Sequence, residues 1–185
     1  MGRRRTGRGL LVGACLLVFL SAGCTPDDPP PAPPSTTVPP PTPTENAQER
    51  EERLAYEAAE KSYREFRAEV ERVYARGGAS KPTAVMKATA GGQYLSSYQE
   101  VSEAYRDLKH YSRGSLKIDY VQRGGFSPSE LILDVCEDGR GVVTYDKKNK
   151  RLYSDDVRKI RLSAKPVSGA WKIWTGKGEE VQSCD

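Results

Sequence analysis

The four cysteines are the residues whose chemistry is easiest to interpret, because their surroundings differ. Cys15 lies inside the apolar run LLVGACLLVFL, and Cys24 follows the small residues SAG. Cys136 and Cys184 lie far along the chain, in the stretches ILDVCEDG and EEVQSCD. A cysteine thiolate can accept a lipid, pair with a second thiol or bind a metal. The compartment and the elements that carry each cysteine decide between these fates.

The N-terminus predicts export. A basic stretch (MGRRRTGRG), an apolar stretch and a small-residue stretch (SAGC) follow one another in the order typical of a secretory signal. The apolar stretch has about eleven residues, fewer than the roughly 20 that a membrane-spanning helix needs. An uncleaved anchor helix is the alternative. We therefore expect residues 1–23 to be a signal peptide.

The stretch LSAGC resembles a bacterial lipobox, in which the cysteine is diacylated and becomes the mature N-terminus. Ala22, Gly23 and Cys24 match the small–small–Cys pattern, whereas Ser21 stands where that family prefers Leu. The resemblance implies that Cys24 carries lipid and that Cys15 is removed with the signal. It also implies an extracytoplasmic protein anchored by lipid to the outer face of the cytoplasmic membrane.

Residues 24–45 are expected to hold the lipidated cysteine and a spacer rich in Pro and Thr. Residues 25–44 contain ten of the 13 prolines. Proline fixes φ and lacks a backbone donor, so this tract favours an extended, semi-rigid chain. A proline-rich docking ligand is the weaker alternative, because no basic residue flanks the tract closely.

In an oxidising compartment, Cys136 and Cys184 would be the two remaining thiols, and we expect them to form a disulfide. It would close a loop of about 48 residues and stabilise the domain by on the order of 4 kcal/mol. A metal site is not predicted, because these cysteines and His110 lack the spacing of a tetrahedral ligand set. No cofactor is predicted either.

Few residues could act as an acid or a base. His110 is the single histidine, and it lies near the end of a predicted helix, where the helix dipole favours a histidine. A histidine at such a position is usually a surface residue. Asp119, Tyr120 and Asp134 lie in predicted strands and would suit either a cavity or the solvent face. No nucleophile elbow, HExxH, GxGxxG or P-loop occurs. We therefore predict no catalytic residue.

The aromatic side chains are more promising as a binding surface than the acid–base candidates are as a catalytic site. Packing between helices and sheet is their first interpretation, and a concave binding face is the second. Such a face could take a small apolar molecule, a glycan or an envelope protein. The candidate cavity residues are Tyr98, Tyr105, Asp119, Trp171 and Trp174.

These residues depend on two kinds of element. From Glu45 to Gly77 apolar residues recur every three or four positions, and shorter helical patterns follow at 82–90 and 93–113. After Gly114 the period becomes two, which predicts four or five antiparallel strands. The stretch CEDGRGVVTYD is interpreted as a hairpin between two of them.

Helices followed by strands indicate the α+β class. The helix order, the passage from YLSSY to GSLKIDYV, the alternating strands and the closing W-x-I…C resemble the NTF2-like (cystatin-like cone) superfamily. More narrowly, they resemble the NTF2-like lipoproteins of actinobacteria. The resemblance implies a domain at 46–185, with three N-terminal helices packed on a curved antiparallel sheet of four to five strands. The superfamily includes enzymes that work in the mouth of the cone.

The formal charge of +4 does not indicate nucleic-acid binding. Four arginines lie in the predicted signal, and removing residues 1–23 leaves 25 basic and 25 acidic residues. We therefore expect a non-catalytic binding or interaction module at the cell envelope. The alternative is a small-molecule carrier or enzyme that uses the cavity of the cone.

Overall fold

The structure is a computed structural model, and it describes residues 45–185. The helices are α1 (Ala47–Ala75), α2 (Ala84–Thr89) and α3 (Gly92–Leu108). The strands are β1 (Tyr111–Arg113), β2 (Lys117–Ser127), β3 (Glu130–Asp138), β4 (Val143–Tyr145), β5 (Arg151–Ser154), β6 (Val157–Val167) and β7 (Ala170–Val181). The predicted signal peptide, Cys24 and the predicted spacer up to residue 44 lie outside the described residues. Within 45–185 no helix is both long and apolar enough to cross a membrane.

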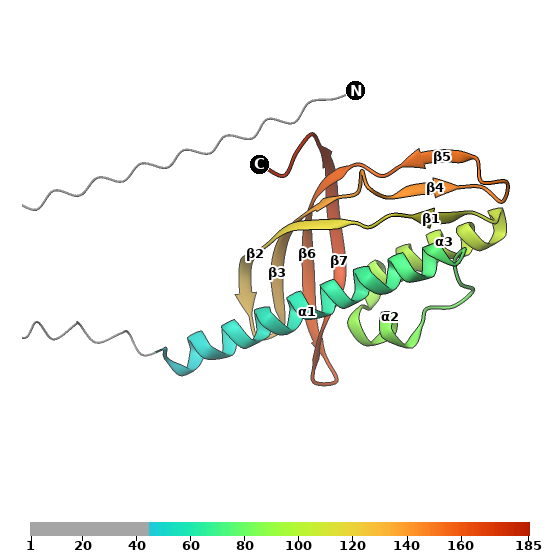
Figure 1. The fold of residues 1–185 in the computed structure, drawn as a ribbon. Helices are drawn as coiled ribbons and strands as arrows, with labels where there is room; N and C mark the ends of the chain where they lie inside the picture. The colour runs from blue at the N-terminus through green and yellow to red at the C-terminus, as the bar shows by residue number, and fades with distance from the viewer. Residues whose placement is uncertain (1–44) are drawn as a thin grey trace, which may run out of the picture. The chain divides into compact units, whose positions relative to one another are not determined.

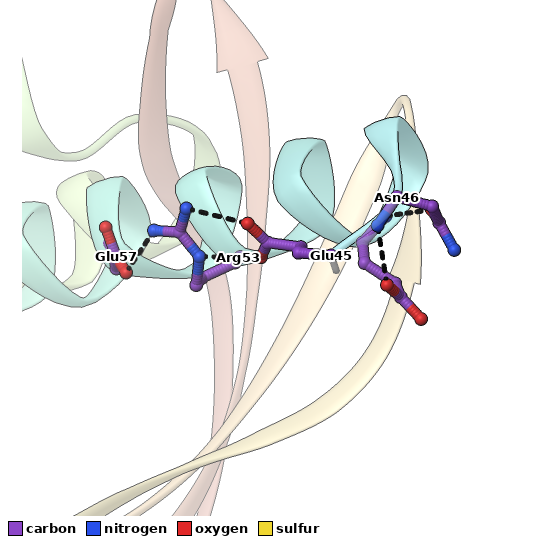
Figure 2. Close-up of polar contacts among 5 residues, drawn as sticks. Glu45, Asn46, Arg53 and Glu57 are labelled. Carbon is purple, nitrogen blue, oxygen red and sulfur yellow. Dashed lines mark hydrogen bonds and ion pairs between the residues drawn. The ribbon is translucent and has the colours of Figure 1, made fainter. Parts of the chain in front are cut away.

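Helix α1 begins at a capping box. Asn46 Oδ1 accepts a hydrogen bond from the backbone N–H of Glu49 at 2.9 Å, and the Glu49 carboxylate accepts one from the backbone N–H of Asn46. Figure 2 shows this cap and, beside it, Arg53 between Glu45 and Glu57, with N···O distances of 2.8 and 2.9 Å. These contacts are exposed, so they define where the helix starts more than they stabilise the domain.

The turn after α1 holds that helix against α3. Gly78 has a φ of 82°, and a Cβ at this position would lie 2.0 Å from the carbonyl oxygen of Ser102, so only glycine fits. The hydroxyl of Ser102 also accepts a hydrogen bond from the backbone N–H of Ala79 at 2.8 Å. Next to this contact, the rings of Tyr74 and Tyr105 stack with centroids 4.5 Å apart.

Strands β2, β3, β6 and β7 form an antiparallel sheet in that order, and α1 runs across one face of it (Figure 1). Alternate residues of each strand point to the helices, as the period of two predicts. The buried core between sheet and helices includes Tyr56, Tyr63, Phe66, Val70, Leu131, Leu133, Val135, Leu162, Ala164 and Ile173. The predicted α+β class is confirmed.

The expectation of one sheet with four to five strands was wrong. The described residues form seven strands in two sheets, the second in the order β1-β4-β5. Strands β1 and β5 have three and four residues, too few to show a period in the sequence. The predicted hairpin at CEDGRGVVTYD is also wrong, because β3 pairs with β2 and β6 whereas β4 pairs with β1 and β5.

The predicted disulfide is confirmed. Cys136 and Cys184 are bonded, with Cα atoms 5.8 Å apart and a sequence separation of 48 residues. Cys136 lies between Val135 and Glu137, which both point toward the helices, so its own side chain points to the opposite face of β3. The bridge therefore attaches the chain beyond β7 to the outer face of the sheet.

Candidate functional site

A cavity of about 670 Å³ lies beside the core. Side chains of α1 and α3 form one wall, and β3, β6 and β7 form the other. Ser112 of β1 and Tyr153 of β5 line it from the second sheet. Its volume falls in the range of about 300–1,000 Å³ that small-molecule pockets occupy. The cavity is therefore large enough to hold an organic ligand.

Five tyrosines give the cavity its aromatic wall, and they are Tyr74, Tyr94, Tyr98, Tyr105 and Tyr153. The rings of Tyr94 and Tyr98 lie 5.0 Å apart, and both lie 5.1 Å from the ring of Phe66 in the core. The hydroxyl of Tyr105 is hydrogen-bonded to that of Thr144 at 2.7 Å. Neighbouring side chains therefore hold Tyr94, Tyr98 and Tyr105 in place, whereas Tyr153 is 47% exposed.

A buried ion pair forms the polar floor. Arg67 of α1 and Glu137 of β3 are 9% and 4% exposed, and Arg67 Nε lies 2.7 Å from Glu137 Oε1. The Nε–H does not point at that oxygen and makes no hydrogen bond, so the contact is an ion pair alone. Arg67 Nη1 donates to the hydroxyl of Tyr98 at 2.6 Å, and the hydroxyl of Tyr63 donates to Glu137.

The protonation states in this floor follow from burial and charge. Burial alone would lower the pKa of Arg67, but Tyr98 and Glu137 outweigh it and raise that pKa well above its ordinary value. The guanidinium therefore stays charged. Burial and the Glu137 carboxylate raise the pKa of Tyr63, so its hydroxyl stays protonated. This hydroxyl donates a hydrogen bond to the Glu137 carboxylate.

Tyr94 brings an unpaired polar group to the same floor. The residue is 6% exposed, and its hydroxyl has no hydrogen-bond partner among the described residues. Burial raises the pKa of Tyr94, and Tyr98, Arg67 and Tyr63 are close enough to act on it as well. A buried hydroxyl without a partner is uncommon, and in a cavity it marks a place where a ligand can form a hydrogen bond.

Further charges lie toward the mouth. Arg158 of β6 donates to Glu180 of β7 across the sheet, with Nη2 and Oε1 3.1 Å apart. Asp155, in the connection before β6, also lines the cavity. Partial burial raises the pKa of Asp155, although the nearby charge of Arg67 partly offsets this. Asp155 therefore keeps its proton to a higher pH than an ordinary aspartate does.

Two glycines leave the wall at β7 without side chains. Gly176 and Gly178 alternate along the strand, both line the cavity, and they pair with Leu162 and Ile160 of β6. A Cβ on Gly176 would lie 3.0 Å from both Leu162 and Tyr94. The space over this part of β7 thus exists because two inward positions carry only a hydrogen atom.

Tyr98 and Tyr105, the two helical residues that the sequence suggested for a cavity, both line it. Asp119 does not. It lies at a register shift of β2 between Ile118 and Tyr120, and its carboxylate pairs with Lys117. The irregularity removes Asp119 from the simple alternation on which a cavity position was expected.

Trp171 and Trp174 are also absent from the cavity lining. Trp171 packs against the core with its ring centroid 6.4 Å from that of Phe126. Trp174 lies under the junction of α2 and α3, where a Cβ on Gly91 would come within 2.4 Å of its ring. Both indoles therefore serve the packing of helices on the sheet, which was the first interpretation of the aromatic residues.

The remaining candidates for acid–base chemistry lie outside this cavity. Asp134 forms an ion pair with Arg161 on the outer face of the sheet, with 2.8 Å between carboxylate oxygen and Nε. His110 lies against Tyr105 with ring centroids 6.2 Å apart, and it borders a separate shallow depression. Within residues 45–185 no group of three or more His, Cys, Asp or Glu could hold a metal ion.

Sequence reasoning missed Arg67 and Glu137, although a signal exists for each. Arg67 follows Tyr63 by four positions and precedes Val70 by three, so it interrupts the apolar stripe of α1. Glu137 follows Val135 by two and continues the inward alternation of β3. A charged residue on each of two facing apolar patterns predicts a buried ion pair, since burial of either charge alone is costly.

No family model matches the sequence, and no curated protein matches it. Solved structures with a similar fold include the intermembrane space region of the chloroplast protein ARC6. The match covers 68% of this chain and 97% of that chain, with 13% sequence identity and a TM-score of 0.51. An NTF2-like protein with a cystatin-like fold from Novosphingobium aromaticivorans gives 11% identity, 74% and 91% coverage, and a TM-score of 0.45. An uncharacterised protein with a cystatin-like fold from Caulobacter vibrioides gives 10% identity, 71% and 90% coverage, and a TM-score of 0.39.

The likeness to the ARC6 region concerns the fold alone, because 13% identity carries no information on activity. The other two structures are described as cystatin-like, but TM-scores of 0.45 and 0.39 carry no argument about this chain. The function has to be argued from the cavity itself.

Proposed function

We propose that this protein is a lipoprotein, held by Cys24 at the outer face of the cytoplasmic membrane, whose domain binds a small amphipathic molecule without converting it. The observation that carries the binding proposal is the cavity of about 670 Å³ beside the core. Tyrosine rings supply its apolar surface, and a few polar groups in its floor can orient a ligand.

The pairing of the two buried charges, Arg67 and Glu137, favours binding of the ligand without chemical conversion. Arg67 and Glu137 compensate each other, and each also has a tyrosine hydroxyl as hydrogen-bond partner. Groups held in this way stabilise one arrangement of α1, α3 and β3. They form a fixed polar floor on which a ligand can rest.

The anchor is supported by the lipobox-like stretch LSAGC and by the proline-rich tract that follows it. Cys24→Ala should move the protein from the membrane fraction to the soluble fraction of cells. Cys15→Ala is the matched control, because that cysteine would be discarded with the signal, and it should leave the protein with the membrane. Retention of Cys24→Ala in the membrane fraction would contradict the anchor.

Ligand binding can be tested with Nile red, a neutral dye whose emission rises in apolar surroundings. We expect saturable binding of one dye per domain. Val101 lines the cavity from α3 and is 45% exposed, so Val101→Trp should occlude the site without disturbing the core. Val85→Trp is the control, because Val85 is 42% exposed on α2 and does not line the cavity. Equal dye binding by both variants would refute a site in the cavity.

Asp155 favours a second candidate, an acid–base enzyme that acts on the bound molecule. A cavity carboxylate whose pKa is raised by burial is the type of group that general acid–base catalysis uses. In that case wild-type protein incubated with an envelope extract should deplete a compound that Asp155→Asn leaves intact, as mass spectrometry would show. Identical extracts after both incubations would exclude this candidate.

A further inference from the structure

We infer that the cavity selects a positively charged ligand, namely an organic ammonium with an aromatic or aliphatic body. This inference rests on the proposed binding function and adds the chemical class of the ligand. It combines the charge of the cavity wall, the faces of its tyrosines and the unpaired hydroxyl in its floor.

The charge of the wall is negative once internal pairs are removed. Glu137 and Glu180 are matched by Arg67 and Arg158. Four further carboxylates line the cavity, and no ion pair joins them to a cation of the described residues: Glu71, Asp155, Asp156 and Glu179. The Glu71 carboxylate accepts a hydrogen bond from the backbone N–H of Leu116 at 2.6 Å, which holds it in place but leaves its charge. A cation that enters is therefore attracted by four carboxylates that no ion pair compensates.

An anion would meet the opposite situation. The two arginines that line the cavity already have carboxylate partners, at 2.7 Å for Arg67 and 3.1 Å for Arg158. An anionic ligand would have to break one of these pairs or share its arginine with a carboxylate. Both arrangements place like charges close together in a partly desolvated site, which is unfavourable.

The tyrosine faces suit a cation as well. The guanidinium carbon of Arg67 already lies 5.2 Å from the ring centroid of Tyr98, so this wall binds one positive group from the protein itself. Tyr74, Tyr105 and Tyr153 also line the cavity, and Tyr74 and Tyr105 lie close enough to Asp155 for its charge to act on them. Tyrosine rings attract cations at their faces. An ammonium with an apolar body would contact rings and carboxylates together.

The hydroxyl of Tyr94 supplies a third, independent indication of a ligand. It is buried, has no partner among residues 45–185, and lies near Tyr98, Arg67 and Tyr63. A polar substituent on the ligand body can form this hydrogen bond, while the ammonium remains near the carboxylates. The occupant is thus an amphipathic cation that carries a polar group in addition to its charge.

Three probes with one ring system test the charge: 1-naphthylmethylammonium, 1-naphthylmethanol and 1-naphthoate. Calorimetric or NMR titration of the folded, disulfide-bonded protein gives their dissociation constants. We expect the ammonium to bind at least about tenfold more tightly than the carboxylate, which is about 1.4 kcal/mol, with the alcohol in between. Raising the ionic strength should narrow this difference, because the carboxylates at the mouth are exposed.

Variants assign the preference to its residues. Asp155→Asn combined with Asp156→Asn should reduce the ammonium preference to about threefold or less and leave the alcohol affinity unchanged. Glu51→Gln combined with Glu100→Gln changes the net charge equally at exposed positions outside the cavity, and it should retain the full preference.

The outcomes separate this inference from the function on which it rests. Equal affinities for the three probes, or tighter binding of the carboxylate, would overturn the charge inference and leave a binding cavity standing. An ammonium preference that persists in the double Asp variant would overturn it too. Failure of all three probes to bind, or binding that Val101→Trp does not change, would contradict the binding function itself.

Discussion

Replacing Arg67 with methionine should strongly destabilise the domain, and the loss should be recovered in part by Glu137→Gln. Methionine keeps an unbranched side chain but removes the guanidinium and its charge, so Glu137 would be left buried without a counter-charge, with Tyr63 as its hydrogen-bond partner. Glu137→Gln alone would instead leave the guanidinium of Arg67 without a counter-charge. The double variant has neither charge in the floor.

The size of the effect follows from burial. Because Arg67 and Glu137 are 9% and 4% exposed, each single substitution should cost about 3–5 kcal/mol, the usual loss when one partner of a buried pair is removed. The double variant should cost at least about 2 kcal/mol less than the sum of the two, since it leaves no uncompensated charge. A domain of this size has a stability of about 5–15 kcal/mol, so each single loss is a large part of the total.

Urea denaturation followed by circular dichroism measures this double-mutant cycle, with the disulfide intact in all four proteins. For a slope of about 1–3 kcal/mol per molar urea, each single variant should shift the midpoint by more than about 1 M. Single losses below about 1 kcal/mol, or two losses that simply add, would refute the view that these charges depend on each other.

Three further predictions concern stability. Removing the disulfide with Cys136→Ala and Cys184→Ala should lower the free energy of unfolding by on the order of 4 kcal/mol, and a loss below about 1 kcal/mol in urea denaturation would contradict that estimate. Asp155→Asn should raise the free energy of unfolding at neutral pH, because burial raises the pKa of Asp155 and disfavours its charged form in the folded state. This gain in stability should vanish at a pH below the ordinary aspartate pKa, where the carboxyl is protonated in both the folded and the unfolded state. An equal gain in urea titrations at neutral pH and at that low pH would count against the prediction. Gly78→Ala should cost more than about 2 kcal/mol, since a positive φ and a backbone clash combine there, whereas Gly125→Ala, with open space around its Cβ, should stay within about 0.5 kcal/mol; similar melting curves for both would refute the steric reasoning.

The places where the helices start could be predicted closely from their regular patterns. The predicted stretch from Glu45 to Gly77 corresponds to α1 at Ala47–Ala75, and the pattern at 82–90 corresponds to α2. The pattern at 93–113 extends too far, because α3 ends at Leu108, Lys109 has a positive φ of 56°, and residues 111–113 form β1. Strands β2, β3, β6 and β7 are long enough to show alternation as well. Strands β1 and β5 are not, and their pairing with β4 depends on contacts that no local pattern records.

The site was predicted in part for a similar reason. Tyr98 and Tyr105 lie on the apolar stripe of α3, so their position beside the sheet follows from helical spacing. Trp171 and Trp174 both lie in β7, but other elements pack over their rings and keep them out of the cavity. Such packing depends on the tertiary structure and leaves no local pattern in the sequence. Arg67 and Glu137 come from elements 70 positions apart in sequence, and only the fold brings them to 2.7 Å.

The two glycines of β7 have a consequence for ligand size. They lie on an edge strand, so a side chain added at Gly178 would meet Ile160 at 3.2 Å but no second neighbouring strand. Alanine or serine there would narrow the binding space in small steps while the helices, the buried ion pair and the disulfide stay as they are. Relatives with this fold could therefore diverge in the bulk of the molecule they accept through single-codon changes at the rim, without re-evolving the core.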